Sequence, residues 1–234
     1  MGLSRYVGGD RLGEFGILFA SLLALMVLPE LLPEEGAVRW QLPLLFSLVM
    51  LSALSTVSRR RREMVIAGSL LALALLPQWI GAFGAAGVGT AGRIPLALFL
   101  IYVCGLILRM VLSARTVDLE VILAALCVYL LLALIWAIAY HLLEVYRPGS
   151  FSIPAAMLAE KANPDQAISA ALHYFSFVTI TTLGYGDVTP VAPLARSMAM
   201  LEAVVGQIYL VTLIARLVSM ETVQAEGEAG LDRD

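Results

Sequence analysis

The feature that most constrains this chain is a series of long apolar segments, each about as long as a bilayer-crossing α-helix. Such a helix needs about 20 apolar residues. Runs of this kind lie at residues 14–32, 40–58, 64–86, 92–113, 117–145 and 194–219. Of the 234 residues, 60% are hydrophobic and 14% charged, an excess that one water-soluble core cannot bury. We therefore expect an all-α membrane protein with six transmembrane helices, which leaves no room for a separate soluble enzyme domain.

Arginines between the runs indicate how the helices are oriented. Loops rich in Arg and Lys stay in the cytoplasm, and the second and third runs are separated by Arg59, Arg60, Arg61 and Arg62. Both termini are then cytoplasmic, and the first run, which no signal-peptide cleavage pattern follows, is expected to be a retained span of a prokaryotic plasma-membrane protein. We interpret the arginine block as a topology determinant; the alternative is a site for anionic lipid headgroups.

A shorter apolar segment, residues 165–181, lies between the fifth and sixth runs and cannot cross the membrane. Because the fifth span runs outward and the sixth inward, this segment must enter and leave on the outer side. Asn163 as N-cap, Pro164 at the first helical position and Gln166 three residues after the cap predict the start of a helix. The helix is expected to end near Thr181, with Asp165 at the positive end of its dipole. The negative end then lies near the membrane centre, where it favours a cation.

A glycine-containing loop follows this short helix. Its sequence is Thr181-Thr182-Leu183-Gly184-Tyr185-Gly186-Asp187. Gly184 and Gly186 can take backbone angles that other residues avoid, which allows an extended strand whose carbonyls turn to one side. Four such strands around an axis would replace an ion's hydration shell with rings of carbonyl oxygens. Thr182 would add a ring of hydroxyls, and Tyr185 is expected to point away from the axis and brace the strand.

From about Leu172 to Val218, the sequence resembles the pore module of tetrameric potassium channels. Residues Thr182 to Gly186 take the place of that family's TVGYG selectivity filter, with Leu183 instead of valine. The resemblance implies passive conduction by a homotetramer, with potassium ions at the filter carbonyls, no catalysis, no cofactor and no nucleic-acid partner. GYG, rather than the GDG of related non-selective channels, favours potassium over sodium. The alternatives are a non-conducting membrane sensor or regulatory subunit that keeps the pore fold, and a secondary transporter.

The resemblance also assigns roles to residues near the filter. Val178 stands where some members of the family carry a glutamate that pairs with the aspartate matched by Asp187, so this filter must be stabilised in another way. Gly206 matches the glycine at which the inner helices of the family bend. Glu202, four residues earlier, is expected to face the pore helix, with either a structural or a gating role.

Four spans before a pore module give the layout of a voltage-gated channel. Residues 1–113 would form a sensor-like domain, 114–220 the pore domain and 221–234 a short acidic cytoplasmic tail. A voltage sensor needs several charges that cross the field, each contributing about 2.3 kcal/mol per 100 mV. The fourth span carries Arg93 near its outer end and Arg109 near its inner end, both interpreted as interfacial anchors. We expect a channel without strong voltage gating.

Two histidines and two cysteines complete the candidates. His141 and His173 lie near the outer face, where they either respond to external pH or form ordinary hydrogen bonds. Cys104 and Cys127 lie within apolar runs, and we interpret them as small buried hydrophobic residues rather than a redox pair or a metal site.

Overall fold

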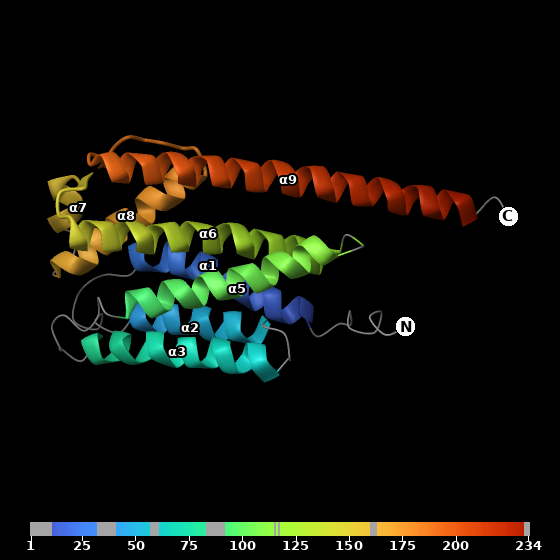
Figure 1. Cartoon of the computed structure of the whole chain (residues 1–234), viewed down its shortest axis with the longest axis horizontal. Helices are drawn as coiled ribbons and strands as arrows, with labels where there is room; N and C mark the ends of the chain where they lie inside the picture. Colours follow the sequence, from blue (N-terminus) through green and yellow to red (C-terminus); the bar gives the residue numbers. More distant parts are fainter. Residues whose placement is uncertain are drawn as a thin grey trace.

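Long apolar helices make up most of the described structure and run roughly along a common axis (Figure 1). The computed structural model describes residues 11–31, 41–56, 61–82, 92–114, 116, 118–159 and 163–231. The first four helices are α1 (Arg11–Leu31), α2 (Gln41–Thr56), α3 (Arg61–Ala82) and α5 (Arg93–Ser113). They are followed by α6 (Leu119–Tyr146), α7 (Ala155–Ala159), α8 (Pro164–Ile180) and α9 (Pro193–Leu231).

Membrane-crossing length is reached within four of these helices. Their spans are Arg61–Ile80, Arg93–Ser113, Leu119–Tyr146 and Pro193–Ser219. Among the described residues, the apolar parts of α1 and α2 are shorter, at Gly13–Leu28 and Pro43–Thr56. The structure therefore supports a helical, multi-pass membrane protein, whereas the six-span layout stays a prediction.

One continuous apolar core joins the early helices to α6. Phe15 of α1, Met50 of α2, Phe99 of α5 and Leu131 of α6 belong to it and are at most 1% exposed. In a bilayer, lipid tails are as apolar as these side chains, so close packing rather than exclusion of water holds such helices together. Of the helices before residue 114, α1 and α5 pack on α6 of their own chain, whereas α2 packs on α1 and α3 packs on α5.

The short helix α8 lies at a steep angle between α6 and α9, at one end of the bundle (Figure 1). It begins as the sequence predicted: the side chain of Asn163 accepts a hydrogen bond from the Asp165 backbone N–H at 3.0 Å, and Pro164 occupies the first turn. It ends at Ile180, one residue before the expected end at Thr181. The prediction of a short capped helix before the glycine-containing loop is confirmed.

A small antiparallel strand pair ties together the segments before and after α8. Strand β1 (Phe151–Ser152) pairs with β2 (Thr189–Pro190). The carboxylate of Glu144, near the end of α6, accepts hydrogen bonds from the backbone N–H groups of Gly149 at 2.7 Å and Phe151 at 3.1 Å. The sequence did not predict this pair, because two-residue strands carry no periodic pattern.

Helix α9 continues past the expected end of the last span. Its 39 residues reach Leu231, so most of the acidic tail expected at 221–234 extends this helix. At 1.5 Å per residue the helix is roughly 58 Å long, well beyond the roughly 30 Å hydrocarbon core of a bilayer. The last turns of α9 therefore lie outside the membrane.

Candidate functional site

The loop between α8 and β2 has positive φ at every second residue. The values are 63° at Thr182, 55° at Gly184 and 77° at Gly186. Glycine takes such angles at little cost, whereas a residue with a Cβ is strained there. Thr182 is the one residue other than glycine with positive φ in the described part of the chain. Backbone strain of this kind tends to occur where geometry matters for function.

Backbone hydrogen bonds fix the start of this loop to the end of α8, and its residues are exposed in the single chain. The Thr182 N–H donates to the carbonyl of Thr179 at 3.0 Å, and the Gly184 N–H donates to that of Val178 at 3.2 Å. All residues from 181 to 187 are exposed, with Tyr185 at 67%. The expected outward contacts of Tyr185 are thus not supplied by its own chain.

A tyrosine from α8 holds the far end of the loop. The Tyr174 hydroxyl donates to Asp187 Oδ2 at 2.6 Å, and the Val188 backbone N–H donates to Oδ1 at 2.9 Å. The bond from Tyr174, with help from that of Val188, keeps the pKa of the Asp187 carboxyl below its usual value. Sequence reasoning identified Asp187 but missed Tyr174, which lies one helical turn before the apolar Val178.

Glu202 of α9 is completely buried against α8 and α6. Its carboxylate accepts a hydrogen bond from the Tyr140 hydroxyl of α6 at 2.5 Å and another from the Ser176 hydroxyl of α8. A buried carboxyl group is costly unless it is hydrogen-bonded. Here both oxygens have a hydroxyl partner, and the Ser176 hydroxyl also lies 2.7 Å from the Ala133 carbonyl oxygen. The side chain lies toward α8, where the sequence placed it; its two partners were not foreseen.

Gly206 lets α9 approach the end of α8 closely. A Cβ at this position would lie 2.6 Å from Ile180 Cγ1 and 3.1 Å from the Ile180 carbonyl oxygen. That oxygen also accepts a hydrogen bond from the Tyr129 hydroxyl of α6 at 2.9 Å. Helix α9 is unbroken through Gly206. Its place in this structure is a packing contact, and bending at this residue stays a prediction.

Residues 128–222 match the family model described as "Ion channel". The matched segment covers fewer than half of the residues and runs from α6 through α8 and the loop to α9. No curated protein matches the chain. The match supports an ion-channel segment in a membrane, and it contains the loop, Tyr174 and Glu202.

Outside the matched segment, Arg93 of α5 reaches the start of α8. Its Nη2 lies 2.7 Å from Asp165 Oδ2, and its side chain is 17% exposed. The expectation that Arg93 anchors in the interface was wrong: α8 begins beside α5, and its carboxylate gives the guanidinium a fixed partner that a headgroup would not. Arg109, at the other end of α5, is exposed.

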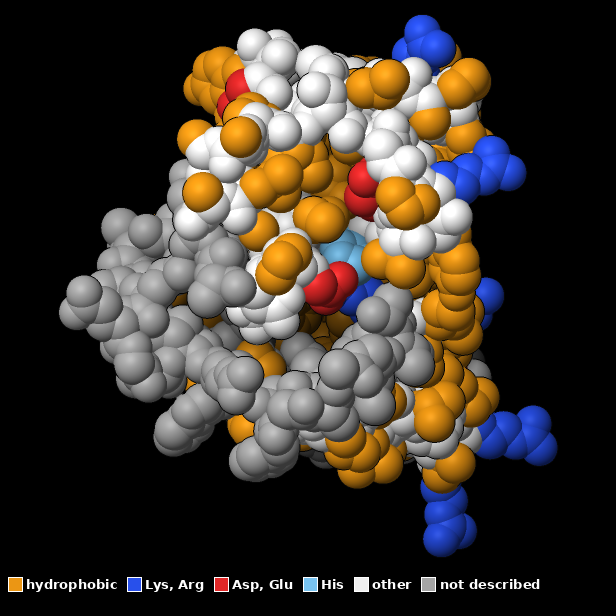
Figure 2. Space-filling model, turned by 90° about the vertical axis from the view of Figure 1, so that its left-hand side faces the viewer, with side chains coloured by type: hydrophobic (Ala, Val, Ile, Leu, Met, Phe, Trp, Pro, Cys, Tyr) orange, Lys and Arg blue, Asp and Glu red, His pale blue; other side chains and the backbone are white. Residues whose placement is uncertain are grey.

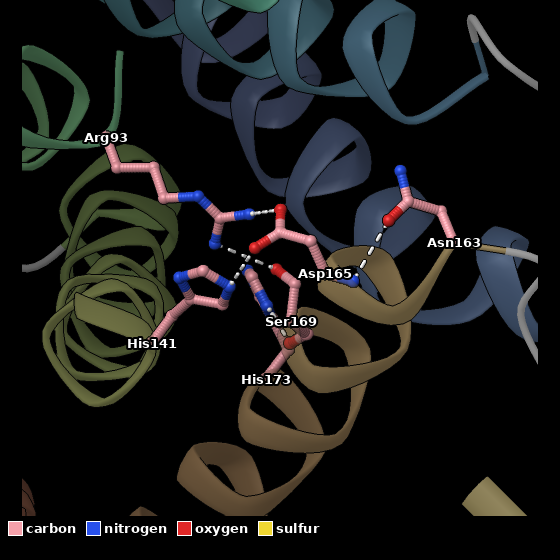
Figure 3. Close-up of polar contacts among 6 residues, drawn as sticks. All are labelled: Arg93, His141, Asn163, Asp165, Ser169 and His173. Carbon is pink, nitrogen blue, oxygen red and sulfur yellow. Dashed lines mark hydrogen bonds and ion pairs between the residues drawn. The ribbon is translucent and has the colours of Figure 1, made fainter. Parts of the chain in front are cut away.

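Both histidines lie in the same cluster (Figure 3). Nε2 of the fully buried His141 is 3.1 Å from Asp165 Oδ1, and Nδ1 of His173 is 2.7 Å from the Ser169 carbonyl oxygen, to which it donates. His141 first, and Arg93 in addition, hold the pKa of the Asp165 carboxyl below its usual value. Viewed from this end of the molecule, acidic, histidine and basic side chains meet in a hollow (Figure 2).

The remaining candidates lie apart from the loop. Cys104 and Cys127 are buried and not joined to one another, in keeping with their interpretation as small apolar residues. Arg61 and Arg62 are exposed at the start of α3. Arg59 and Arg60 of the same block lie outside the described residues.

Proposed function

We propose that this chain is one subunit of a potassium-selective channel in which four copies line one pore. The observation that carries the proposal is the backbone of Thr182 to Gly186, with positive φ at alternate residues. Alternating left-handed and right-handed residues turn successive peptide groups the same way, which directs a row of carbonyls toward one side. Rings of such carbonyls coordinate a dehydrated potassium ion.

The exposed loop supports an assembly of several copies. Irregular backbone does not face lipid, because its polar groups would have no partners there. Yet residues 181–187 are all exposed in the single chain, and Tyr185 and Leu183 are 67% and 57% exposed. Neighbouring copies would cover these side chains and leave the carbonyls to the ions. One loop per chain then supplies one quarter of each ring.

Weak voltage dependence belongs to the same proposal. Helix α5 carries two charged residues, Arg93 and Arg109, and Arg93 is ion-paired with Asp165. Moving one charge across the membrane contributes about 2.3 kcal/mol per 100 mV, so a steep response needs several charges that are free to move.

The orientation that places the start of α8 outside and both termini in the cytoplasm of a prokaryotic cell is part of this proposal. In this proposal the arginine block of residues 59–62 acts as a topology determinant, with contact to anionic lipid headgroups as the alternative.

The test is reconstitution in a planar bilayer with potassium on one side and sodium on the other. Reversal near the potassium equilibrium potential, with a shallow voltage dependence, is expected. Gly184→Ala should abolish selective current, because alanine is strained at a φ of 55° while the space around it is open. Gly105→Ala, a helical glycine whose added Cβ also meets nothing within 4 Å, is the matched control. Reversal near zero would reject potassium selectivity, and silence in several lipids would favour a non-conducting subunit.

A further inference from the structure

Two different parts of the chain hold one carboxylate at the start of α8. Arg93 Nη2 from α5 donates to Asp165 Oδ2 at 2.7 Å, and His141 Nε2 from α6 lies 3.1 Å from Asp165 Oδ1. The Arg93 Nη1 also lies 3.4 Å from Ser169 Oγ, one turn further along α8. Figure 3 shows these side chains converging between the three helices. Contacts at two successive turns fix both the position and the direction of the helix.

The backbone that carries Arg93 is closely packed against neighbouring helices. It follows Gly92, where a Cβ would lie 3.0 Å from Pro77 Cβ and 3.3 Å from the Ala74 carbonyl oxygen, so the start of α5 packs closely on α3. Phe99 and Val103, further along α5, are fully buried in the core shared with α6. The backbone at Arg93 is therefore fixed in place. The bond from its guanidinium to the Asp165 carboxylate is charge-assisted and directional.

The other end of α8 carries the filter loop. Val178 accepts the hydrogen bond of the Gly184 N–H, and Tyr174 donates to Asp187. Helix α8 has 17 residues and is therefore roughly 26 Å long. Because Glu202 and Tyr129 contact the last turns of α8, release of its start at Asp165 lets the helix pivot about those contacts and changes its direction where the loop is attached.

We propose that Arg93 is a positioning residue through which the peripheral helices hold the pore helix α8 and set how long the filter stays conducting. This inference rests on the proposed channel function. Loss of the Arg93–Asp165 pair frees the start of α8, so the filter loop leaves its conducting shape sooner. Ion selectivity, which depends on the loop itself, does not change.

The test is a double-mutant cycle on the reconstituted channel. The variants are Arg93→Met, Asp165→Asn and the double variant, with Arg93→Lys as the conservative replacement and Arg109→Met as the control from the exposed end of α5. The measured quantity is the rate at which potassium current decays during sustained recording. Each single variant is expected to speed decay about five- to tenfold, and the double variant no more than the stronger of the two single variants. Arg93→Lys and Arg109→Met should decay at the wild-type rate.

Two results would overturn the inference while the channel still conducts: effects of the two single variants that multiply in the double variant, or an equal effect of Arg109→Met. If the wild-type protein passes no potassium current, the proposed function fails. Hydrogen exchange of the purified full-length protein then tests separately whether Arg93 holds the start of α8. Amides at residues 167–172 should exchange faster in Arg93→Met and at the wild-type rate in Arg109→Met. Unchanged exchange in Arg93→Met would refute the positioning role of Arg93.

Discussion

The variant Tyr174→Phe removes one hydroxyl group. It tests how the loop at residues 181–187 is stabilised in a chain that has valine, rather than glutamate, at position 178. The substitution deletes the donor to Asp187 Oδ2 at 2.6 Å and leaves the ring in place. A hydrogen bond to a charged group contributes about 1.5–3 kcal/mol. Tyr174 and Asp187 are both partly open to water in the single chain, which competes for the bond, so we expect about 1 kcal/mol per subunit.

This magnitude predicts different outcomes for independent and concerted loops. If each of the four loops of the proposed tetramer fails by itself, a loss of about 1 kcal/mol speeds current decay roughly fivefold. If all four loops must change together, the losses add to about 4 kcal/mol and the acceleration approaches a thousandfold. The assay is current decay at constant voltage in symmetrical potassium, with Tyr146→Phe as the control because the Tyr146 side chain is 71% exposed at the end of α6. Decay within twofold of wild type would refute a stabilising role for the Tyr174–Asp187 bond.

The remaining predictions concern the other contacts of α8 and the loop. Gly206→Ala should lower the melting temperature of the purified protein, because its Cβ would lie 2.6 Å from Ile180 and overpacking costs about 1–3 kcal/mol; unchanged melting would favour a role in bending alone. Glu202→Leu should also lower it, because it leaves the buried Tyr140 hydroxyl without its acceptor, at about 1–3 kcal/mol. An equal or higher melting temperature would contradict that account. Current decay should be the same from external pH 8 to 5, because the Asp187 pKa lies below its ordinary 3.8. The contribution of this carboxylate is full above that value and is lost only as pH falls through the lower folded pKa; a change in decay between pH 8 and 5 would contradict this assignment.

The parts of the structure that the sequence predicted are those set by local signals. Asn163 and Pro164 predict the start of α8, because the Asn163 side chain caps the helix and Pro164 fits its first turn. The apolar runs likewise predicted long helices, because each run is a property of consecutive residues. The glycines of the loop predicted unusual backbone angles at Gly184 and Gly186, and positive φ occurs at both.

The contacts that sequence reasoning missed join residues far apart in the chain. Arg93 and Asp165 are 72 positions apart, and nothing in either local sequence indicates the other. An arginine at the end of an apolar run looks the same whether it meets a lipid headgroup or a carboxylate. Tyr174 could have been found by asking which side chain, one turn before Val178, has a donor that reaches Asp187. The positive φ of Thr182 had no such signal, because threonine rarely adopts it.

Helix α8 is held within a single chain from its first turn to its last. Arg93 and His141 contact its start, Glu202 accepts a bond from its Ser176, and Tyr129 binds the carbonyl of Ile180 at its end. The loop that follows has fixed ends and an exposed middle. In the proposed channel, a rigid helix that carries an uncovered loop would let each chain set the position of its own filter strand before assembly. In the proposed tetramer, neighbouring copies would then have only to cover Tyr185 and Leu183 and close the rings of carbonyls, so variants on α8 should alter how long the filter conducts and leave the selection of ions to the loop.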